Sequence, residues 1–115
     1  MNELDFVTQR IRAFRDARDW RKFHNPKNLA CSITIEAAEL LEHFQWKTPE
    51  ESTAHALIKK EALSEEIADV GIYLIALADN LGINLLEAID RKLAINEIKY
   101  PVDKAKGSAA KYTEL

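Results

Sequence analysis

The chain has 115 residues, a net charge of -3 at neutral pH, 47% apolar residues and 30% charged residues. This length fits one domain, and the apolar content excludes an intrinsically disordered chain. The acidic balance argues against non-specific binding to nucleic acid, and no apolar run reaches the ~20 residues of a membrane span. We therefore expect a folded cytoplasmic protein with no nucleic-acid or membrane partner.

Two local features support the same expectation. Glu3 and Asp5 lie where a secretory signal would carry basic residues. The single cysteine, Cys31, excludes an internal disulfide, and we expect it to be a small core residue because it falls among apolar residues of a helical pattern.

The first predicted helix covers about residues 3–19. Its apolar stripe consists of Phe6, Val7, Ile11, Phe14 and Ala17. The arginines around its other faces predict a solvated surface or, alternatively, a phosphate contact. A break follows that contains Trp20, Phe23 and His24. These rings form either a hydrophobic plug under a loop or a stacking surface for a planar ligand.

Asn25 and Pro26 predict the start of a second helix, which continues to about Trp46. Glu36, Glu39 and His43 share one face of it, because residues three and four apart are neighbours on a helix. Acids on a helix face are usually solvated, and metal ligation is the alternative for this pair. We leave His43 out of the metal site.

Thr48 to Glu51 form a capping box with proline at the first helical position. It opens a long helical segment, interrupted near residues 59–62, which ends at Leu81 with Gly82 as its cap. Residues 67–77 are apolar on nearly all sides, which predicts burial. Three neighbouring helices cannot cover such a helix, so we expect a homo-oligomer built on it, and Gly71 indicates close approach of another helix.

A second carboxylate pair, Glu66-x-x-Asp69, lies in this segment, and Asp69 interrupts the apolar run. A carboxylate there pays a desolvation cost of several kcal/mol unless it is paired or binds a metal. Glu36, Glu39, Glu66 and Asp69 together suit Mg²⁺ or Mn²⁺, since these ions prefer oxygen ligands and no His or Cys stands at zinc spacing. A Mg²⁺ held in this way is typical of sites for substrate phosphates.

The last predicted helix runs from the cap residue Asn84 to about Tyr100, and Pro101 stops it. Lys92 and Asn96 share one of its faces, which predicts either a solvated basic stripe or a phosphate contact. Residues 102–115 lack periodicity and predict an extended tail. We thus expect an all-α fold, a four-helix-bundle protomer that assembles into a dimer or dimer of dimers, with a catalytic domain over 1–101 and a tail over 102–115.

With these residues in place, the chain resembles the MazG-type all-α nucleotide pyrophosphohydrolases, and within them the small dCTP pyrophosphatase branch. The resemblance covers about residues 14–101 and the closing Lys111–Leu115. The matching motifs are Arg18-Asp19-Trp20, Phe23-His24, Asn28-Leu29, Glu36-x-x-Glu39-Leu40, Phe44-Gln45-Trp46-Lys47, Glu65-Glu66-x-x-Asp69-Val70-x-Ile72-Tyr73-Leu74 and Lys92-x-x-x-Asn96-x-x-x-Tyr100-Pro101.

The resemblance implies cleavage of a nucleoside triphosphate between its α and β phosphates, with pyrophosphate as a product. It assigns Mg²⁺ ligation and catalysis to the four carboxylates Glu36, Glu39, Glu66 and Asp69, with Glu36 as a candidate to activate water. Trp20 and Trp46 would enclose the base with His24 nearby, Tyr73 would contact the sugar, and Lys92 and Asn96 would hold the phosphates. It also implies dimers of dimers with sites shared between subunits.

The expected function is therefore removal of excess or modified dCTP-like nucleotides from the nucleotide pool. The segment between Trp46 and Glu65 is short beside the animal members of that branch, so base preference does not transfer. Two alternatives stay open at this point. One is a non-catalytic helical module that binds nucleotides or a protein partner, and the other treats the acids as a solvated face.

Overall fold

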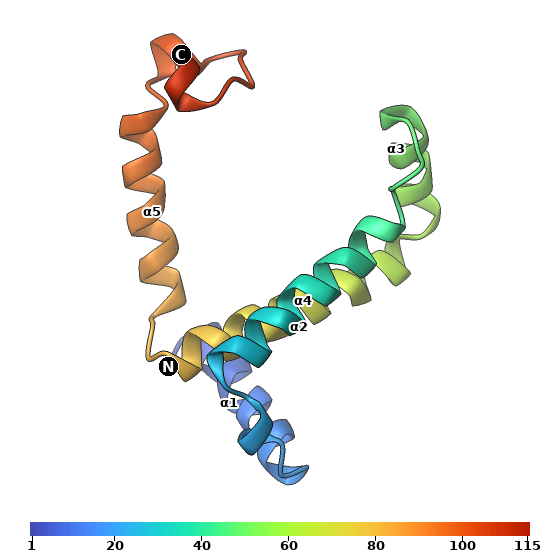
Figure 1. Cartoon of the computed structure of the whole chain (residues 1–115), viewed down its shortest axis with the longest axis vertical. Coiled ribbons are helices and arrows are strands. Elements are labelled where there is room, and N and C mark those ends of the chain that lie inside the picture. Colours follow the sequence, from blue (N-terminus) through green and yellow to red (C-terminus); the bar gives the residue numbers. More distant parts are fainter. The chain divides into compact units, whose positions relative to one another are not determined.

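The computed structural model describes residues 1–115 and contains helices without strands, so the all-α prediction is confirmed (Figure 1). The helices are α1 (Glu3–Ala17), α2 (Pro26–Glu42), α3 (Pro49–Ile58), α4 (Lys60–Asn80), α5 (Leu85–Lys99) and α6 (Val102–Ala105), with short 3-10 turns at Arg21–Phe23 and Tyr112–Glu114. The chain divides into two compact units, Met1–Gly82 and Ile83–Leu115.

Side-chain caps fix where the helices begin. The side chains of Asn2, Asn25, Thr48 and Asn84 each accept a hydrogen bond from the backbone N–H three residues further on. Each cap satisfies a donor that has no partner within its helix, and proline follows at the first position of α2 and α3. These starts were therefore predictable from local sequence alone.

One helix ends well before its predicted end. The second helix stops at Glu42 rather than Trp46, because the N–H groups of His43 and Phe44 bond the carbonyls of Leu40 and Leu41, three residues back, and tighten the chain into a turn. The long segment breaks at Lys59, as expected, and separates α3 from α4.

The pairing of α2 with α4 is the centre of the first unit. The two helices run antiparallel and side by side (Figure 1), and α4 also contacts α1 and α3. The buried side chains are Leu29 on α2 with Leu63 and Ala78 on α4, all less than a tenth exposed. The hydrophobic effect at this seam sets the register of the two helices, which positions every polar group along them.

Polar contacts attach the N-terminal segment to the end of α4. The guanidinium of Arg12 on α1 donates two hydrogen bonds to the carboxylate of Asp79, and this contact lowers the pKa of Asp79. The side-chain amide of Asn80 donates to the carbonyl of His24 at 3.0 Å. The turn that carries Trp20 and His24 is thus held beside the end of α4.

Several apolar side chains that we expected to be buried are exposed within the single chain. Ile67 is 58% exposed, Asp69 and Cys31 are exposed, and a Cβ added at Gly71 would meet nothing within 4 Å. The predicted burial of residues 67–77 on nearly all sides is therefore wrong for one chain. The reason is that α4 packs mainly against α1, α2 and α3 of its own chain, which together leave part of its surface uncovered. The oligomer and its four-helix bundle stay predictions.

None of the helices taken singly has the length and apolar composition of a membrane span. Only α4 and α5, counted together across the break between them, reach that length and composition.

The second unit consists of α5, α6 and the final turn. Residues 102–115, which we expected to be extended, contain α6 and the turn Tyr112–Glu114. Tyr112 packs edge-on against Tyr100 with 5.9 Å between ring centroids, and the Lys99 Nζ lies 4.8 Å from the Tyr112 ring. These aromatic and cation–π contacts, which have no periodic sequence signature, fold the segment back onto the end of α5.

We expect Leu29→Ala to destabilise the protein by about 2–5 kcal/mol, because Leu29 is 2% exposed and its loss leaves a cavity beside α4. Chemical denaturation followed by far-UV circular dichroism measures this change. Leu57→Ala is the matched control, since it removes the same atoms at a position that is 79% exposed in the chain. Equal losses in the two variants would contradict the assignment of the core.

Candidate metal centre

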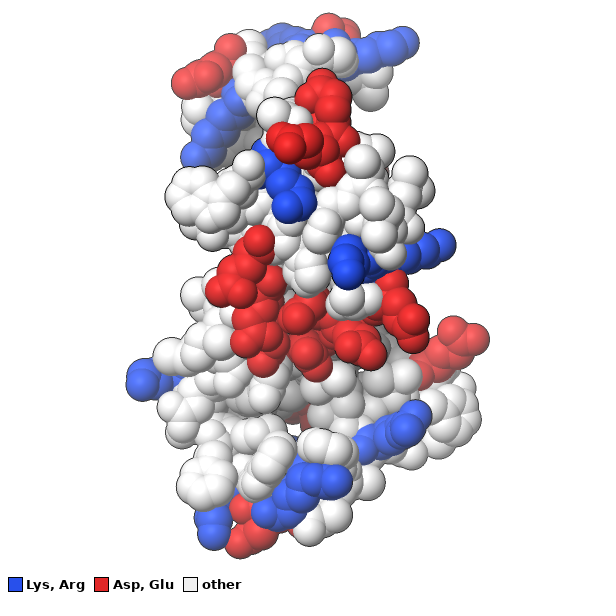
Figure 2. Space-filling model, turned by 90° about the vertical axis from the view of Figure 1, so that its right-hand side faces the viewer, with Lys and Arg blue, Asp and Glu red and all other residues white.

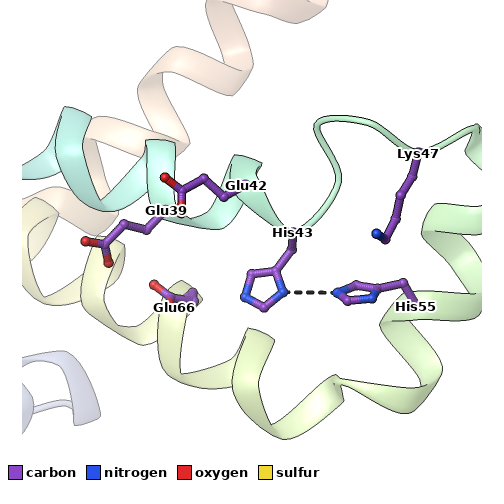
Figure 3. A pocket seen from close by; sticks show the side chains of 6 residues that line it. All are labelled: Glu39, Glu42, His43, Lys47, His55 and Glu66. Carbon is purple, nitrogen blue, oxygen red and sulfur yellow. Dashed lines mark hydrogen bonds between the residues drawn. The ribbon is translucent and has the colours of Figure 1, made fainter.

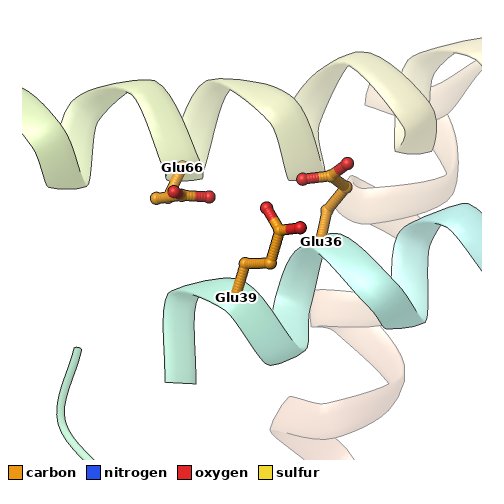
Figure 4. Close-up of side chains that lie close together, drawn as sticks. All are labelled: Glu36, Glu39 and Glu66. Atoms are coloured by element: carbon orange, nitrogen blue, oxygen red, sulfur yellow. The ribbon is translucent and has the colours of Figure 1, made fainter. Parts of the chain in front are cut away.

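Acidic side chains form a band across the middle of the face drawn in Figure 2, with lysines and arginines above and below it. Three acidic side chains of the chain converge between two helices. Glu36 and Glu39 lie one turn apart on α2, and Glu66 lies on the facing surface of α4 (Figure 4). One carboxylate oxygen from each residue lies within 4.8 Å of the other two. The helix pairing therefore brings together three of the four predicted ligands.

Two of these carboxylates carry a buried oxygen without a partner. The Oε2 atoms of Glu36 and Glu66 are shielded from solvent and accept no hydrogen bond. Burial raises the pKa of Glu36 and of Glu66, and the neighbouring charge of Glu39 raises both further. A buried acceptor without a donor is costly, and like charges this close oppose ionisation. A divalent cation with oxygen ligands fits this arrangement, because it supplies the missing partner and removes the repulsion.

Asp69 lies one turn after Glu66 on α4, outside the group of three. Burial and the neighbouring Glu39 are the larger causes of the raised pKa of Glu36 and Glu66, and the charge of Asp69 adds to both. The sequence argument located the desolvated carboxylate at Asp69, whereas the structure locates it at Glu36 and Glu66. The residues around Asp69 are apolar in sequence, but Asp69 itself is exposed in the single chain.

A pocket of about 440 Å³ adjoins the cluster (Figure 3). Its lining residues are Glu39, Glu42, His43, Lys47, His55 and Glu66. The Nδ1 atom of His43 lies 3.0 Å from the Nε2 atom of His55. Sequence reasoning set His43 aside and missed His55. The spacing of His43 from Glu39 was a signal, but the place of His55 depends on the turn between α2 and α3, which no motif encodes.

The two tryptophans lie at opposite ends of α2. Trp20, 41% exposed, precedes the helix and packs edge-on against Phe14, whereas Trp46, 88% exposed, lies in the turn that follows it. The helix has 17 residues, so at 1.5 Å per residue it is about 25 Å long. One chain alone therefore does not place a base between Trp20 and Trp46. His24 is half-buried near Trp20, and this burial lowers its pKa.

Tyr73 is half-buried on α4, four residues after Asp69, so the two share a helix face. Lys92 and Asn96 lie one turn apart on α5, in the second unit, with Lys92 exposed and Asn96 half-buried. Their expected contact with phosphates stays a prediction.

We expect Glu36→Gln to stabilise the metal-free protein by a few degrees at about pH 8, and to have little effect at about pH 4, where carboxyl groups are near their ordinary pKa. Folding raises the pKa of Glu36, because burial disfavours the charged carboxylate. The protonated Glu36 side chain therefore contributes to the stability of the folded protein below the ordinary carboxyl pKa, and this contribution is lost as pH rises through the raised pKa.

Thermal unfolding in a chelator at the two pH values measures this effect, with Glu61→Gln, an exposed acid outside the cluster, as the control. If Glu36→Gln is less stable than the parent in chelator at high pH, the Glu36 carboxylate has a stabilising partner and the prediction is wrong.

The chain is similar to several known proteins in sequence and fold. The chain is 45% identical over 104 residues to dCTP pyrophosphatase 1 of Mus musculus, and 44% identical over the same length to that of Homo sapiens, covering 89% of this chain in each case. It spans 61% of the length of each relative. Its fold is similar to the crystal structure of a pyrophosphatase from Archaeoglobus fulgidus, with a TM-score of 0.84 and 48% identity over 88% of this chain and 94% of that one.

A profile of the MazG-like family matches residues 31–115, which include most of α2, all of α4 and the three clustered carboxylates. The match covers most of the chain, and the sequence and fold likenesses agree with it. This protein belongs to the MazG-like family.

Proposed function

We propose that the protein is a Mg²⁺-dependent nucleoside triphosphate pyrophosphohydrolase that acts on a deoxynucleotide, dCTP or a modified form of it. The observation that carries the proposal is the cluster of Glu36, Glu39 and Glu66, in which two buried oxygens lack a partner. The names of the relatives, dCTP pyrophosphatases, support the substrate class. Water adds to phosphorus, the bond between the α and β phosphates breaks, and the products are a nucleoside monophosphate and pyrophosphate.

The donor set supports Mg²⁺, with Mn²⁺ as the second choice, because the cluster offers carboxylate oxygens only. Glu36, Glu39 and Glu66 would hold the ion, and Asp69 would complete the set from the next turn of α4. When bound, such an ion neutralises phosphate charge and lowers the pKa of an attacking water.

Other roles in the proposed reaction, which are proton transfer and binding of the sugar and phosphates, fall to side chains of this chain. Glu36 has an oxygen without a hydrogen-bond partner and a raised pKa, both of which suit a group that takes a proton from water during the attack. Tyr73, one turn beyond Asp69, would contact the sugar, where a phenol would disfavour a 2′-hydroxyl. Lys92 and Asn96 on α5 would hold the phosphates.

The base site requires two copies of the chain. Trp20 and Trp46 are separated by the length of α2, so a base stacked between two indole rings takes one ring from each copy. The exposed apolar side chains of Ile67 and Leu74, which lie seven residues apart on one face of α4, supply a surface on which the copies can associate. We therefore place the active site at the contact between two protomers of a homodimer or homotetramer.

We expect Glu39→Gln and Asp69→Asn each to lower pyrophosphate release by about a hundredfold or more, beyond what loss of a residue that only orients a metal ligand typically costs. Each change removes a negative charge from the cluster while keeping the shape of the side chain. The assay incubates a panel of dNTPs and NTPs with Mg²⁺ and separates the products by ion-exchange chromatography, which gives the bond cleaved and the base preferred.

Glu61→Gln, at the start of the same helix as Asp69, is the control and should retain activity. Unchanged turnover in Glu39→Gln or Asp69→Asn would remove the proposed metal site. If the parent protein yields no Mg²⁺-dependent product from any nucleotide, the non-catalytic alternative replaces the enzyme.

The two-copy base site predicts complementation. Trp20→Ala and Trp46→Ala should each be strongly impaired, but co-expressed chains should recover about a quarter of the parent activity, because half of random dimers are mixed and each mixed dimer has one intact site. Co-expressed chains that stay as inactive as the separate variants would show that both rings act within one protomer.

A further inference from the structure

The histidine pair beside the carboxylate cluster has no role in the proposed reaction. His43 lies just after α2 and His55 lies on α3, so the pair joins two helices across the turn that carries Trp46. The two rings tilt toward each other, with centroids 5.3 Å apart and ring planes at 46°. Their facing atoms are both nitrogens, at a separation of 3.0 Å.

This separation is that of two neighbouring ligands on one metal ion. Zinc–imidazole bonds are about 2.0–2.1 Å long, so two such nitrogens are about 2.9 Å apart at a right angle and about 3.4 Å apart at the tetrahedral angle. The observed 3.0 Å falls inside this interval. A metal ion bound to both nitrogens would lie to one side of the line that joins them, so each ring would turn to aim its lone pair at the ion.

We propose that His43 and His55 form a second metal site, separate in its chemistry from the carboxylate cluster, which takes a borderline divalent ion such as Zn²⁺, Ni²⁺ or Co²⁺. Imidazole nitrogen selects these ions over Mg²⁺, which prefers oxygen. The inference rests on the geometry of the first unit and is independent of the proposed activity.

The electrostatics of the pocket favour a cation at this place. Three carboxylates, Glu39, Glu42 and Glu66, line it with the pair, against the single positive charge of Lys47. In Figure 3 the ring of His43 lies between the Glu66 carboxylate and the ring of His55. Burial, followed by the charge of Lys47, lowers the pKa of His55, which keeps this ring in the neutral form that binds metals.

The protons balance without any co-reactant. Each neutral ring carries one N–H, and the shared hydrogen bond uses one of these two protons. When the ion binds both facing nitrogens, the donor ring moves its proton to its other nitrogen, so none is lost. If His43 is the donor, that nitrogen is Nε2, on the side of Glu66, and a carboxylate behind a metal-bound histidine is a common orienting partner.

A bound ion would fasten α3 to the end of α2 and restrain the turn between them.

The test titrates the full-length, tag-free protein with Zn²⁺ by calorimetry, in excess Mg²⁺ to fill the carboxylates. All variants carry Cys31→Ser, because Cys31 is exposed and a thiolate also binds zinc. We expect one Zn²⁺ per chain, and about tenfold or greater weakening in His43→Gln and in His55→Gln, at least the cost of losing an orienting partner.

His24→Gln is the matched control, since His24 is the third histidine of the chain and lies at the other end of α2, and it should leave the affinity unchanged. A second measurement needs no variant at the site. Side-chain nitrogen NMR of the Cys31→Ser protein should show two of its three imidazoles shifting together as Zn²⁺ is added. Equal weakening by His24→Gln, full affinity in both other histidine variants, or no paired imidazole shift would each overturn the proposal.

Discussion

The packing of α2 against α4 is the interaction on which the rest of the structure depends. Apolar side chains such as Leu29 and Ala78 hold the helices together, and the same register forces Glu36, Glu39 and Glu66 to face each other. Burial at this helix contact raises the pKa of Glu36 and Glu66, and the neighbouring charge of Glu39 raises both further. The core and the carboxylate cluster are therefore two consequences of one helix pair.

The sequence predicted those features that depend on local chemistry. The starts of α2 and α3 followed from Asn25 and Thr48, because a cap acts within three residues of itself. The carboxylate pairs followed from helical spacing, which places residues three apart on one face. The resemblance to a known family supplied the substrate class and the roles of residues that spacing alone leaves open.

Features that depend on tertiary arrangement were not predictable. We predicted a desolvated carboxylate at Asp69 because its neighbours in the sequence are apolar. Burial depends instead on which helix packs against a face, and the contact between α2 and α4 shields oxygens of Glu36 and Glu66 while Asp69 is exposed. His55 had no signal, since its approach to His43 requires the tight turn after Glu42. The prediction that Cys31 is a core residue was wrong for the same reason. Apolar neighbours in the sequence do not determine which face of a helix is covered by other helices.

The charge of the site also constrains how a nucleotide can enter it. A triphosphate is an anion, and the first unit presents Glu39, Glu42 and Glu66 around a pocket with Lys47 as its one cation. Burial raises the pKa of Glu36 and Glu66, and the charge of Glu39 raises both further, so the carboxylates of the cluster also oppose one another's ionisation. Under the proposed function, a nucleotide would be repelled by these charges in the absence of a metal ion. Nucleotide and divalent cation would then bind together or in the order metal first, which would tie substrate affinity to the metal concentration.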